Sequence, residues 1–445
     1  MGALGFFGIV AAAAVVAVGP LAHGQSFQIV KIADTSTAIP LIGDAFTRFS
    51  VPSGFAFVGQ SDNGFSGVYE YVTGFPSGSM IDTLASTDMT ASGFAAGVDY
   101  AGFSSVSDGA FVQSFIATTT IGVTAVYSDP AKPVLIAETG ESSSSGIVFN
   151  SFTNVSGTYD NNTVTATGEF LSNAGIYFFS IGGGVRLTQE ATTTPPSSFS
   201  DLGQPNFKAG YGGATIFGVG STIQSMRATS NGVQGIYYSA PNGPSATPGA
   251  FTKLVDTTSQ VPGGAGDFTS FGDPAANNSD LVFTAHYNQN GSDQQGIFAL
   301  GNYLYDNGGN APSLTLEELV ASGAVAPGSG GAHFEDFLAV TPNGTFLADL
   351  DNGTQGIYRL GGEPDFSINS SVSEVIDTTD LLGGKAITSF GLSNEGDEYE
   401  DGGTSFLVNF ADGSQGIYYF LVPEPGTLSV LGVFAMLVNR KRKAL

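Results

Sequence analysis

Few residues of this chain have side chains suited to acid–base or nucleophilic catalysis. It has three His and no Cys. His23 lies in an apolar N-terminal segment, and the other two, His286 and His333, lie far apart in the sequence. No G-x-S-x-G turn or comparable nucleophile motif accompanies either of them, so the sequence predicts no Ser–His–Asp arrangement. Catalytic residues are therefore unknown from the sequence.

Acidic side chains form two clusters that have the chemistry to bind a cation. Residues 395–402 read Glu-Gly-Asp-Glu-Tyr-Glu-Asp-Gly, and residues 349–353 read Asp-Leu-Asp-Asn-Gly. Calcium takes roughly six to eight oxygen ligands, often from carboxylates on acidic loops. Neither segment follows the spacing of an EF-hand loop, so each is either a calcium site or a solvated loop. Calcium is the one cofactor that the sequence suggests.

The two remaining His and the many acids allow further readings. His286 follows the apolar residues Phe283-Thr284-Ala285 and is expected to mark the end of a strand. His333 precedes Glu335 and Asp336, where it either joins a metal site or is structural. Paired carboxylates also hydrolyse glycosides. With 39 Asp and Glu, nothing in the sequence selects such a pair.

These residues must be positioned by a repeated unit, because one short motif recurs along the chain. Gly-Ile-Tyr or a close variant begins at Gly67, Gly122, Gly175, Gly235, Gly296, Gly356 and Gly416, with successive intervals of 55, 53, 60, 61, 60 and 60 residues. Gln precedes the last four copies. A near-constant period of this length indicates one supersecondary unit repeated seven times.

Each unit contains four recurring pieces that are typical of short strands. The first is an aromatic pair, as at Phe46/Phe49, Phe268/Phe271 and Phe334/Phe337, with Ile387/Phe390 as a variant. An apolar strand, the Gly-Ile-Tyr strand and a Leu/Val segment ending in Asp-Thr-Thr follow, the last as at residues 254–258 and 375–379. Asn-Gly or Asp-Gly between the second and third pieces, at residues 63–64, 290–291, 352–353 and 412–413, predicts tight hairpins.

Within the Gly-Ile-Tyr motif each residue has an expected structural role. Gly allows the close approach of a neighbouring backbone, and Ile fills the space between adjacent units. Tyr is expected to be half buried with its hydroxyl in water. An alternative is that the repeated Tyr form a ring of aromatic faces that stacks sugars.

The order of the pieces resembles the tandem repeats of TolB-like β-propellers. The resemblance implies an all-β fold, a seven-bladed β-propeller of four-stranded antiparallel blades over residues 25–421. The chain opens with residues 27–35, which match the closing piece, and it ends at Gly416–Phe420 without one. We therefore expect the N-terminal strand to complete the last blade and close the ring, which hides the sheet edges.

Residues 1–24 read as a secretory signal peptide. An apolar run from Phe6 to Val18 precedes Gly19-Pro20, and Ala22-His23-Gly24 forms a small-x-small cleavage site before Gln25. The segment before the run has no Lys or Arg, which departs from the usual pattern. The sequence thus predicts that the chain passes through the export machinery.

Residues 422–445 closely resemble the PEP-CTERM sorting signal. They contain Pro423-Glu424-Pro425, an apolar run from Leu428 to Val438, and the basic cluster Arg440-Lys441-Arg442-Lys443. The resemblance implies sorting by an exosortase in a Gram-negative bacterium that makes exopolysaccharide, with a final place at the cell surface, the outer membrane or outside the cell. The run is short against the roughly 20 residues of a membrane span, which favours transient insertion. Whether the tail is cleaved or retained as an anchor stays open.

Charge and composition narrow the function. The formal net charge is −26, which repels nucleic acid and attracts cations. The sequence favours a non-enzymatic, exported module that binds exopolysaccharide or another surface component through its loops. The alternatives are a polysaccharide lyase or hydrolase on the same scaffold and a purely structural matrix protein. Ligand and oligomeric state are beyond the sequence.

Overall fold

The structure of the chain is a computed structural model, and only part of the chain is described below. The described residues are 15–16, 27–40, 42–72, 80–109, 112–128, 133–141, 148–157, 163–170, 173–180, 186–192, 199–202, 206–209, 222–239, 252–264, 266–276, 280–301, 315–361, 371–393 and 403–422. They contain no α-helix and one short 3-10 turn, η2 (Pro262–Gly264). All other regular structure in them is β-strand.

The described strands form seven antiparallel sheets, which we name by their inner strands. The β3 sheet contains β3 (Arg48–Phe49), β4 (Ala56–Gln60), β5 (Ser66–Val72) and β6 (Met80–Ser86). The β7 sheet contains β7 (Tyr100–Gly109), β8 (Val112–Thr119), β9 (Thr124–Ser128) and β10 (Val134–Glu138). The β11 sheet contains β11 (Ser151–Gly157), β12 (Thr163–Phe170), β13 (Asn173–Ser180) and β14 (Arg186–Thr192).

The next two sheets split their inner strand into two pieces. The β15 sheet contains β15 (Phe199–Leu202), β16 (Asn206–Ala209), β17 (Thr222–Ser230), β18 (Val233–Ser239) and β19 (Thr252–Asp256). The β20 sheet contains β20 (Asp267–Phe271), β21 (Ala275–Ala276), β22 (Asp280–Gln289), β23 (Ser292–Gly301) and β24 (Thr315–Ala321). In each, both pieces pair with the same second strand.

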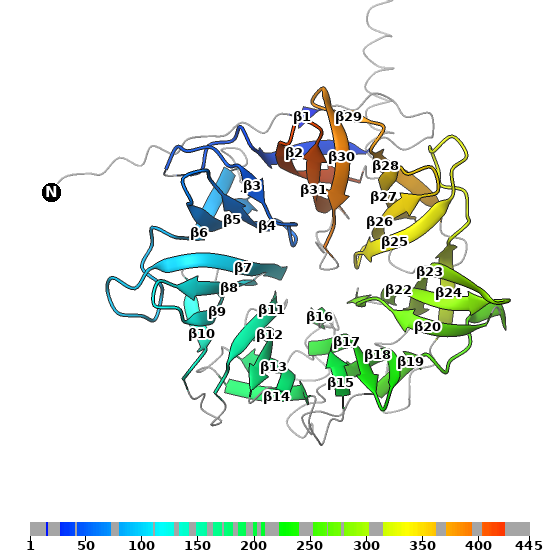
Figure 1. The fold of residues 1–445 in the computed structure, drawn as a ribbon, viewed down its shortest axis with the longest axis horizontal. Helices are drawn as coiled ribbons and strands as arrows, with labels where there is room; N and C mark the ends of the chain where they lie inside the picture. The colour runs from blue at the N-terminus through cyan, green and yellow to red at the C-terminus, as the bar shows by residue number, and fades with distance from the viewer. Residues whose placement is uncertain are drawn as a thin grey trace, which may run out of the picture.

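Of the last two sheets, one has four strands in chain order, and the other includes two strands from the start of the chain. The β25 sheet contains β25 (Phe334–Val340), β26 (Thr345–Leu350), β27 (Gln355–Leu360) and β28 (Val372–Asp377). The β30 sheet contains β29 (Leu381–Leu382), β30 (Lys385–Gly391), β31 (Thr404–Phe410), β32 (Gln415–Leu421), β2 (Gln28–Asp34) and β1 (Val15–Val16). Figure 1 shows the sheets arranged around a common centre, which is the architecture of a β-propeller.

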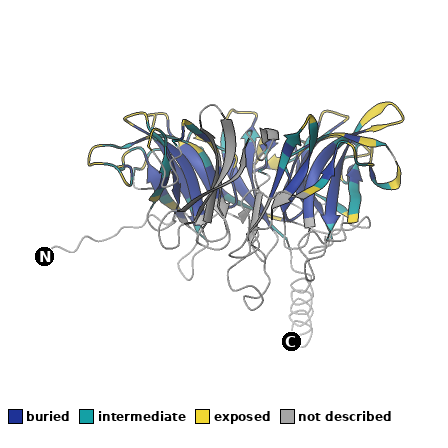
Figure 2. Cartoon of the chain, turned by 90° about the horizontal axis from the view of Figure 1, so that it is seen from below, coloured by how far each residue is buried: buried dark blue, intermediate teal, exposed yellow. Residues whose placement is uncertain are grey.

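Hairpin turns join the second and third strands of the sheets. The turn glycines Gly64, Gly291, Gly353 and Gly413 all have positive φ, between 78° and 87°. Asn290 also has positive φ, so both central residues of its turn lie in the left-handed region that Asn-Gly accepts. The predicted hairpins are therefore confirmed. Figure 2 shows buried residues within the sheets and exposed residues on described turns.

The Gln before Gly-Ile-Tyr hydrogen-bonds to the neighbouring sheet. In each of the last four copies its side-chain Oε1 accepts the backbone N–H of the second aromatic residue of the next inner strand. The contacts join Gln234 to Phe271 (2.7 Å), Gln295 to Phe337 (2.6 Å), Gln355 to Phe390 (2.7 Å) and Gln415 to Phe49 (3.0 Å). The motif thus ties each of these third strands to the sheet that follows it.

The Gly and Ile of the motif have the packing roles that the sequence predicted: Gly allows a close approach, and Ile fills the space between sheets. A Cβ added at Gly356 would lie 2.7 Å from the ring of Tyr358, which folds back across it. Ile357 is fully buried in one apolar cluster with Ile387 and Phe390 of the next sheet. Burial of such a side chain contributes about 1.5–3 kcal/mol, so the interface between sheets is a main source of stability.

The Tyr of the motif is more buried than the sequence predicted. Tyr69, Tyr127 and Tyr358 are 0% exposed, and their hydroxyls have no hydrogen-bond partner among the described residues. The prediction of a half-buried Tyr with a wet hydroxyl is wrong for these three, because the ring packs inside its own sheet against the aromatic pair. These rings are not available as a surface that stacks sugars.

The second copy of the motif lies three residues later than predicted. Gly122 has a φ of +82° and belongs to the hairpin turn before β9. The residues that match the motif are Ala125, Val126 and Tyr127, because Ala125 pairs with Glu138 as Gly356 pairs with Asp377. A small Ala replaces the Gly at this position. The nearest Gly, Gly122, belongs to the preceding turn and does not mark the motif.

The N-terminal strand pairs with the last Gly-Ile-Tyr strand. β2 runs antiparallel to β32 from the pair Gln28↔Leu421 to the pair Asp34↔Gly416. Phe55 of the first sheet contacts Tyr419 of the last one, with ring centroids 4.8 Å apart. The first strand of the body thus lies beside the last strand of the chain in one sheet. β1, from the predicted signal peptide, lies on the far side of β2.

Replacement of Gln295 by Ala should destabilise the protein by about 2–3 kcal/mol. Its amide accepts the N–H of Phe337 and donates to the carbonyl of the same residue at 2.9 Å, both in a buried interface. The variant leaves these backbone groups unpaired. Urea unfolding measures the loss. Gln294→Ala is the matched control, because its side chain is only half buried, and an equal loss in both variants would contradict the role assigned to Gln295.

Candidate cation site

The two His outside the signal segment each contact one exposed acid. His286 lies inside β22, which continues to Gln289, so the prediction that it ends a strand is wrong. Its Nδ1 lies 3.3 Å from Asp293 Oδ2 across the hairpin. His333 Nδ1 lies 3.0 Å from Asp351 Oδ2, and the His333 N–H donates to Asp351 Oδ1. These hydrogen bonds lower the pKa of Asp351 and tie the two ends of one hairpin together.

The predicted acidic clusters have different outcomes. In residues 349–353, Asp349 Oδ1 accepts a hydrogen bond of 2.9 Å from Gln355 Nε2, and Asp351 contacts His333. Both acids therefore have protein partners. The cluster at residues 395–402 and the sorting residues Pro423, Glu424, Pro425 and Arg440–Lys443 lie outside the described residues.

A third group of acids, absent from the predictions, lies at the end of β28. One carboxylate oxygen of each of Glu374, Asp377 and Asp380 lies within 4.8 Å of the others, the one such group of three metal-ligand side chains among the described residues. Asp377 is 4% exposed. Asp380 Oδ2 accepts the N–H of Asp377 at 3.1 Å.

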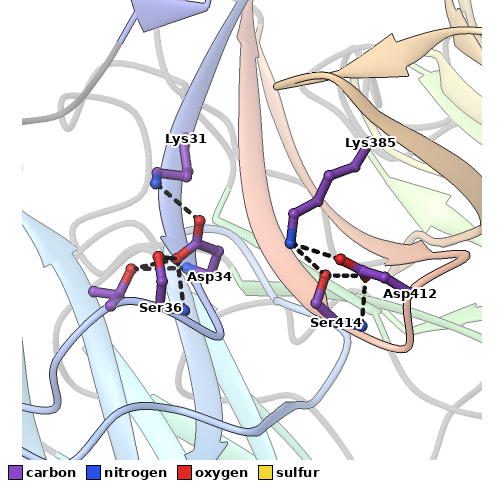
Figure 3. A network of polar contacts seen from close by, with 7 residues as sticks. Lys31, Asp34, Ser36, Lys385, Asp412 and Ser414 are labelled. Carbon is purple, nitrogen blue, oxygen red and sulfur yellow. Dashed lines mark hydrogen bonds and ion pairs between the residues drawn. The ribbon is translucent and has the colours of Figure 1, made fainter.

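The same corner exists in two other sheets, with different residues. Asp34 at the end of β2 and Asp256 at the end of β19 pair with the motif glycine, as Asp377 does. In both, a Lys three residues earlier donates to the Asp: Lys31 Nζ lies 2.8 Å from Asp34 Oδ2, and Lys253 Nζ lies 2.6 Å from Asp256 Oδ2. Figure 3 shows the Lys31–Asp34 contact, beside a second ion pair between Lys385 and Asp412.

The turn after each Asp is built from the same hydrogen bonds. Oδ1 of the Asp accepts the N–H and the hydroxyl of the residue two positions later, Ser36, Thr258 or Thr379. The N–H of the Asp donates to the side chain three positions later, which is Thr37, Ser259 or Asp380. The three corners therefore share one backbone conformation and differ only in side chains.

The charge of the corner differs sharply between the sheets. Where β2 and β19 carry Lys, Asp and a hydroxyl residue, β28 carries Glu374, Asp377 and Asp380. A neutral set thus becomes a set with three potential negative charges. The backbone bulge is common to all three corners, since the extra residue, Val375 on β28, follows the position of Lys or Glu.

Burial and the local charges change the acidity of this group. Burial, together with the Asp377 and Asp380 carboxylates, raises the pKa of the Glu374 carboxyl to about 7. Burial also raises the pKa of Asp380, an effect that the N–H of Asp377 partly offsets. The pKa of the Tyr358 hydroxyl is raised by burial and then by Glu374 and Asp377, which lie close to it.

The sequence contained a signal for this group. The closing segments of two repeats, residues 254–258 and 375–379, come directly after Lys253 and Glu374. Extending the alignment by one position places Lys31, Lys253 and Glu374 in one column. The reversal of charge in that column marks the β28 corner as different from its equivalents.

Comparisons with known proteins do not assign the chain to a family. No protein-family model matches the chain, and no curated protein matches it. Among solved structures, the β-propeller domain of Myceliophteria thermophila Cps50 (Swd1) aligns over 85% of this chain and 100% of its own, with 9% identity and a TM-score of 0.40. The C-terminal WD40 domain of Sif2 aligns over 89% and 99%, with 8% identity and a TM-score of 0.35. Similarity at this level carries no functional argument.

Among the residues that the structure describes, no helix has the length and apolar character needed to cross a bilayer. The segment with the predicted transient insertion, from Leu428 to Val438, lies outside these residues.

Replacement of Asp256 by Asn should cost about 1–2 kcal/mol of unfolding free energy at neutral pH. Although burial opposes it, hydrogen bonds from Lys253 and Thr258 lower the pKa of Asp256 from 3.8 to about 2. A lowered folded-state pKa stabilises the fold above the ordinary pKa, and this contribution is lost as the pH falls from about 4 to about 2.

The difference between wild type and Asp256→Asn should therefore narrow on acidification. Urea unfolding at several pH values from about 7 to about 3 measures it. Asp293→Asn, at an acid that is 70% exposed, is the control and should have little effect at any pH. A gap that stays constant with pH would show that charge is not the cause.

Proposed function

We propose that the chain is an exported seven-bladed β-propeller of the cell surface or extracellular matrix that binds exopolysaccharide without catalysing its breakdown. The observation that carries the proposal is the pairing of β2 with β32. It adds a strand from the start of the chain to the last sheet, whose described residues end directly before the predicted sorting segment.

Three features support a closed ring of seven blades. Each of the seven sheets corresponds to one sequence repeat. Gln415 links the last sheet to Phe49 of the first by the same hydrogen bond that links other neighbours. The aromatic contact of Phe55 with Tyr419 packs the same two sheets together. Closure would protect strand edges in an exported protein that has no disulfides.

The two ends of the chain support export and sorting. Residues 1–24 have the pattern of a signal peptide, and residues 422–445 have the pattern of a PEP-CTERM tail. The described body ends at Val422, directly before Pro423. A tail in this place could be recognised by an exosortase without unfolding the body. Its basic cluster would hold the C-terminus on the cytoplasmic side before processing.

A binding role is supported by the scaffold and by the position of its acids. Sheets of a propeller hold their loops on a rigid frame, which is where binding residues usually lie. The described group of three acids lies on β28 and in the turn after it, at the outer strand of its sheet and not on an inner strand around the centre. This position favours a module that binds over an enzyme with acids at a central channel.

Substitution of Ala for Pro423, Glu424 and Pro425 should block processing of the tail. In the native host, the wild-type protein should lack the Arg440–Lys443 cluster, whereas the variant should keep it and remain with the membrane fraction. Mass spectrometry of C-terminal peptides and cell fractionation measure both. Glu335→Ala, at an exposed residue of β25, is the control. An identical C-terminus in wild type and variant would contradict sorting through this motif.

The purified protein should bind the exopolysaccharide of its own host with saturation and leave the polymer length unchanged. Co-sedimentation measures binding, and size-exclusion chromatography of the polymer measures its length. Shortening of the polymer would establish the lyase or hydrolase alternative instead. Neither binding nor shortening would leave the structural alternative, in which the propeller has no specific ligand.

A further inference from the structure

We propose that Glu374, Asp377 and Asp380 form a binding site for one divalent cation, with calcium preferred, at the outer corner of the β25 sheet. The inference is independent of export and of polysaccharide binding. It starts from the geometry of a corner that occurs in three sheets with the same turn and different side chains.

At two of the three corners the fold already holds a cation. The ammonium groups of Lys31 and Lys253 lie against Oδ2 of Asp34 and Asp256, at 2.8 and 2.6 Å. Oδ1 of each Asp is occupied by the turn. At the third corner Thr379 occupies Oδ1 of Asp377 in the same way, so Oδ2 is the oxygen that faces the position of the missing ammonium.

The third corner replaces that ammonium by further acid. Glu374 stands where Lys31 and Lys253 stand, and Asp380 stands where Thr37 and Ser259 stand. Three carboxylates that approach within 4.8 Å repel one another unless a proton or a cation lies between them. A divalent cation in the position of the ammonium neutralises most of this charge.

Unlike the equally unpartnered hydroxyls of Tyr69 and Tyr127, the hydroxyl of Tyr358 lies near two of the three grouped carboxylates. Tyr358 is 0% exposed, and its hydroxyl has no hydrogen-bond partner among the described residues. It pairs directly with Glu374 across β27 and β28, and its hydroxyl lies near Glu374 and Asp377. Unpaired hydroxyls are rare in protein interiors because they cost free energy. A bound cation, with its water, would satisfy this hydroxyl.

The same applies to one oxygen of Glu374. Oε2 is buried and has no partner among the described residues. Gly328, in the loop that leads to β25, lies so close over this oxygen that a Cβ there would overlap with it. The loop therefore covers the carboxylate and keeps it at the corner. A covered, unpartnered carboxylate oxygen is suited to direct coordination of an ion.

The ligand chemistry favours calcium over other cations. The ligands are carboxylate and hydroxyl oxygens with neither Cys nor His, which suits hard cations and not zinc or copper. Three carboxylates at irregular positions, completed by water, fit the flexible coordination of calcium better than the strict octahedron of magnesium. A cation here would join β28 to the turn that leads into the last sheet.

Calcium titration of the full chain by isothermal calorimetry tests the site. The wild type should bind one calcium with a dissociation constant of about 10⁻⁴–10⁻³ M, as extracellular sites of low rigidity do. Glu374→Lys recreates the residue pair of the other two corners and should weaken calcium binding by about a hundredfold or more. Glu335→Lys, the same charge change at an exposed position of β25, should leave the affinity within about twofold.

Stability gives a second readout of the same variants. Calcium should raise the melting temperature of the wild type and of Glu335→Lys but not of Glu374→Lys. If Glu374→Lys does not fold, Asp380→Ser, which restores the hydroxyl type of Ser259, should weaken calcium binding instead. No calcium binding by the wild type, or equal affinity in wild type and corner variants, would overturn the proposal.

Terbium luminescence tests the placement of Tyr358 beside the ion. The chain has no Trp, so Tyr residues are the groups that sensitise bound terbium. Terbium should bind in the place of calcium and show sensitised emission that calcium displaces. Tyr358→Phe should strongly reduce this emission while terbium still binds. Emission that is unchanged by Tyr358→Phe would place the ion elsewhere and overturn the assignment.

Discussion

The hydrogen bond from the Gln side chain to the backbone of the neighbouring sheet is the interaction on which the packing of these sheets depends. Gln355 and its equivalents meet the N–H of an aromatic residue in the next inner strand. The contact can form only when two sheets pack at one fixed offset, because the Gln oxygen must reach one particular backbone N–H, and that N–H belongs to a buried residue. The Ile that follows then fills the interface, and the Gly makes room for the Tyr ring. One sequence motif thus sets the spacing within a sheet and between sheets.

The same scaffold allows local variation where the packing does not depend on it. The outer corner of a sheet keeps its Asp, its turn and its bulge at β2, β19 and β28, yet its other side chains change from Lys to Glu. The Asp therefore has a different charged neighbour at different corners. Lys253 neutralises Asp256 directly, whereas Glu374 places a second carboxyl beside Asp377. A repeated fold can therefore carry different side chains at the same corner of different sheets.

Comparison within the chain also explains which predictions succeeded. Strand order, hairpin turns and the role of the motif Ile followed from local patterns, because turn chemistry and apolar spacing act over a few residues. The state of Tyr358 did not follow, since its burial depends on Phe334, which packs on it at 4.9 Å from another strand. The second motif copy lies at Ala125 and not at Gly122, because Ala125 occupies the position that Gly has in the other copies. His286 does not end its strand, because β22 continues beyond its apolar residues to Gln289.

The sequence by itself determined an all-β repeat chain with targeting patterns at both ends, because period, turn residues and terminal motifs are local properties. It also determined that the first strand of the body matches the closing piece that the last repeat lacks. Only the tertiary structure decided which acids lie close together and which residues they contact. It paired Asp351 with His333, and it gathered Glu374, Asp377 and Asp380 into one group, with the hydroxyl of Tyr358 near the first two. The physical reason is that a bulge and a turn fix side-chain directions, and a one-dimensional pattern of acids does not contain them.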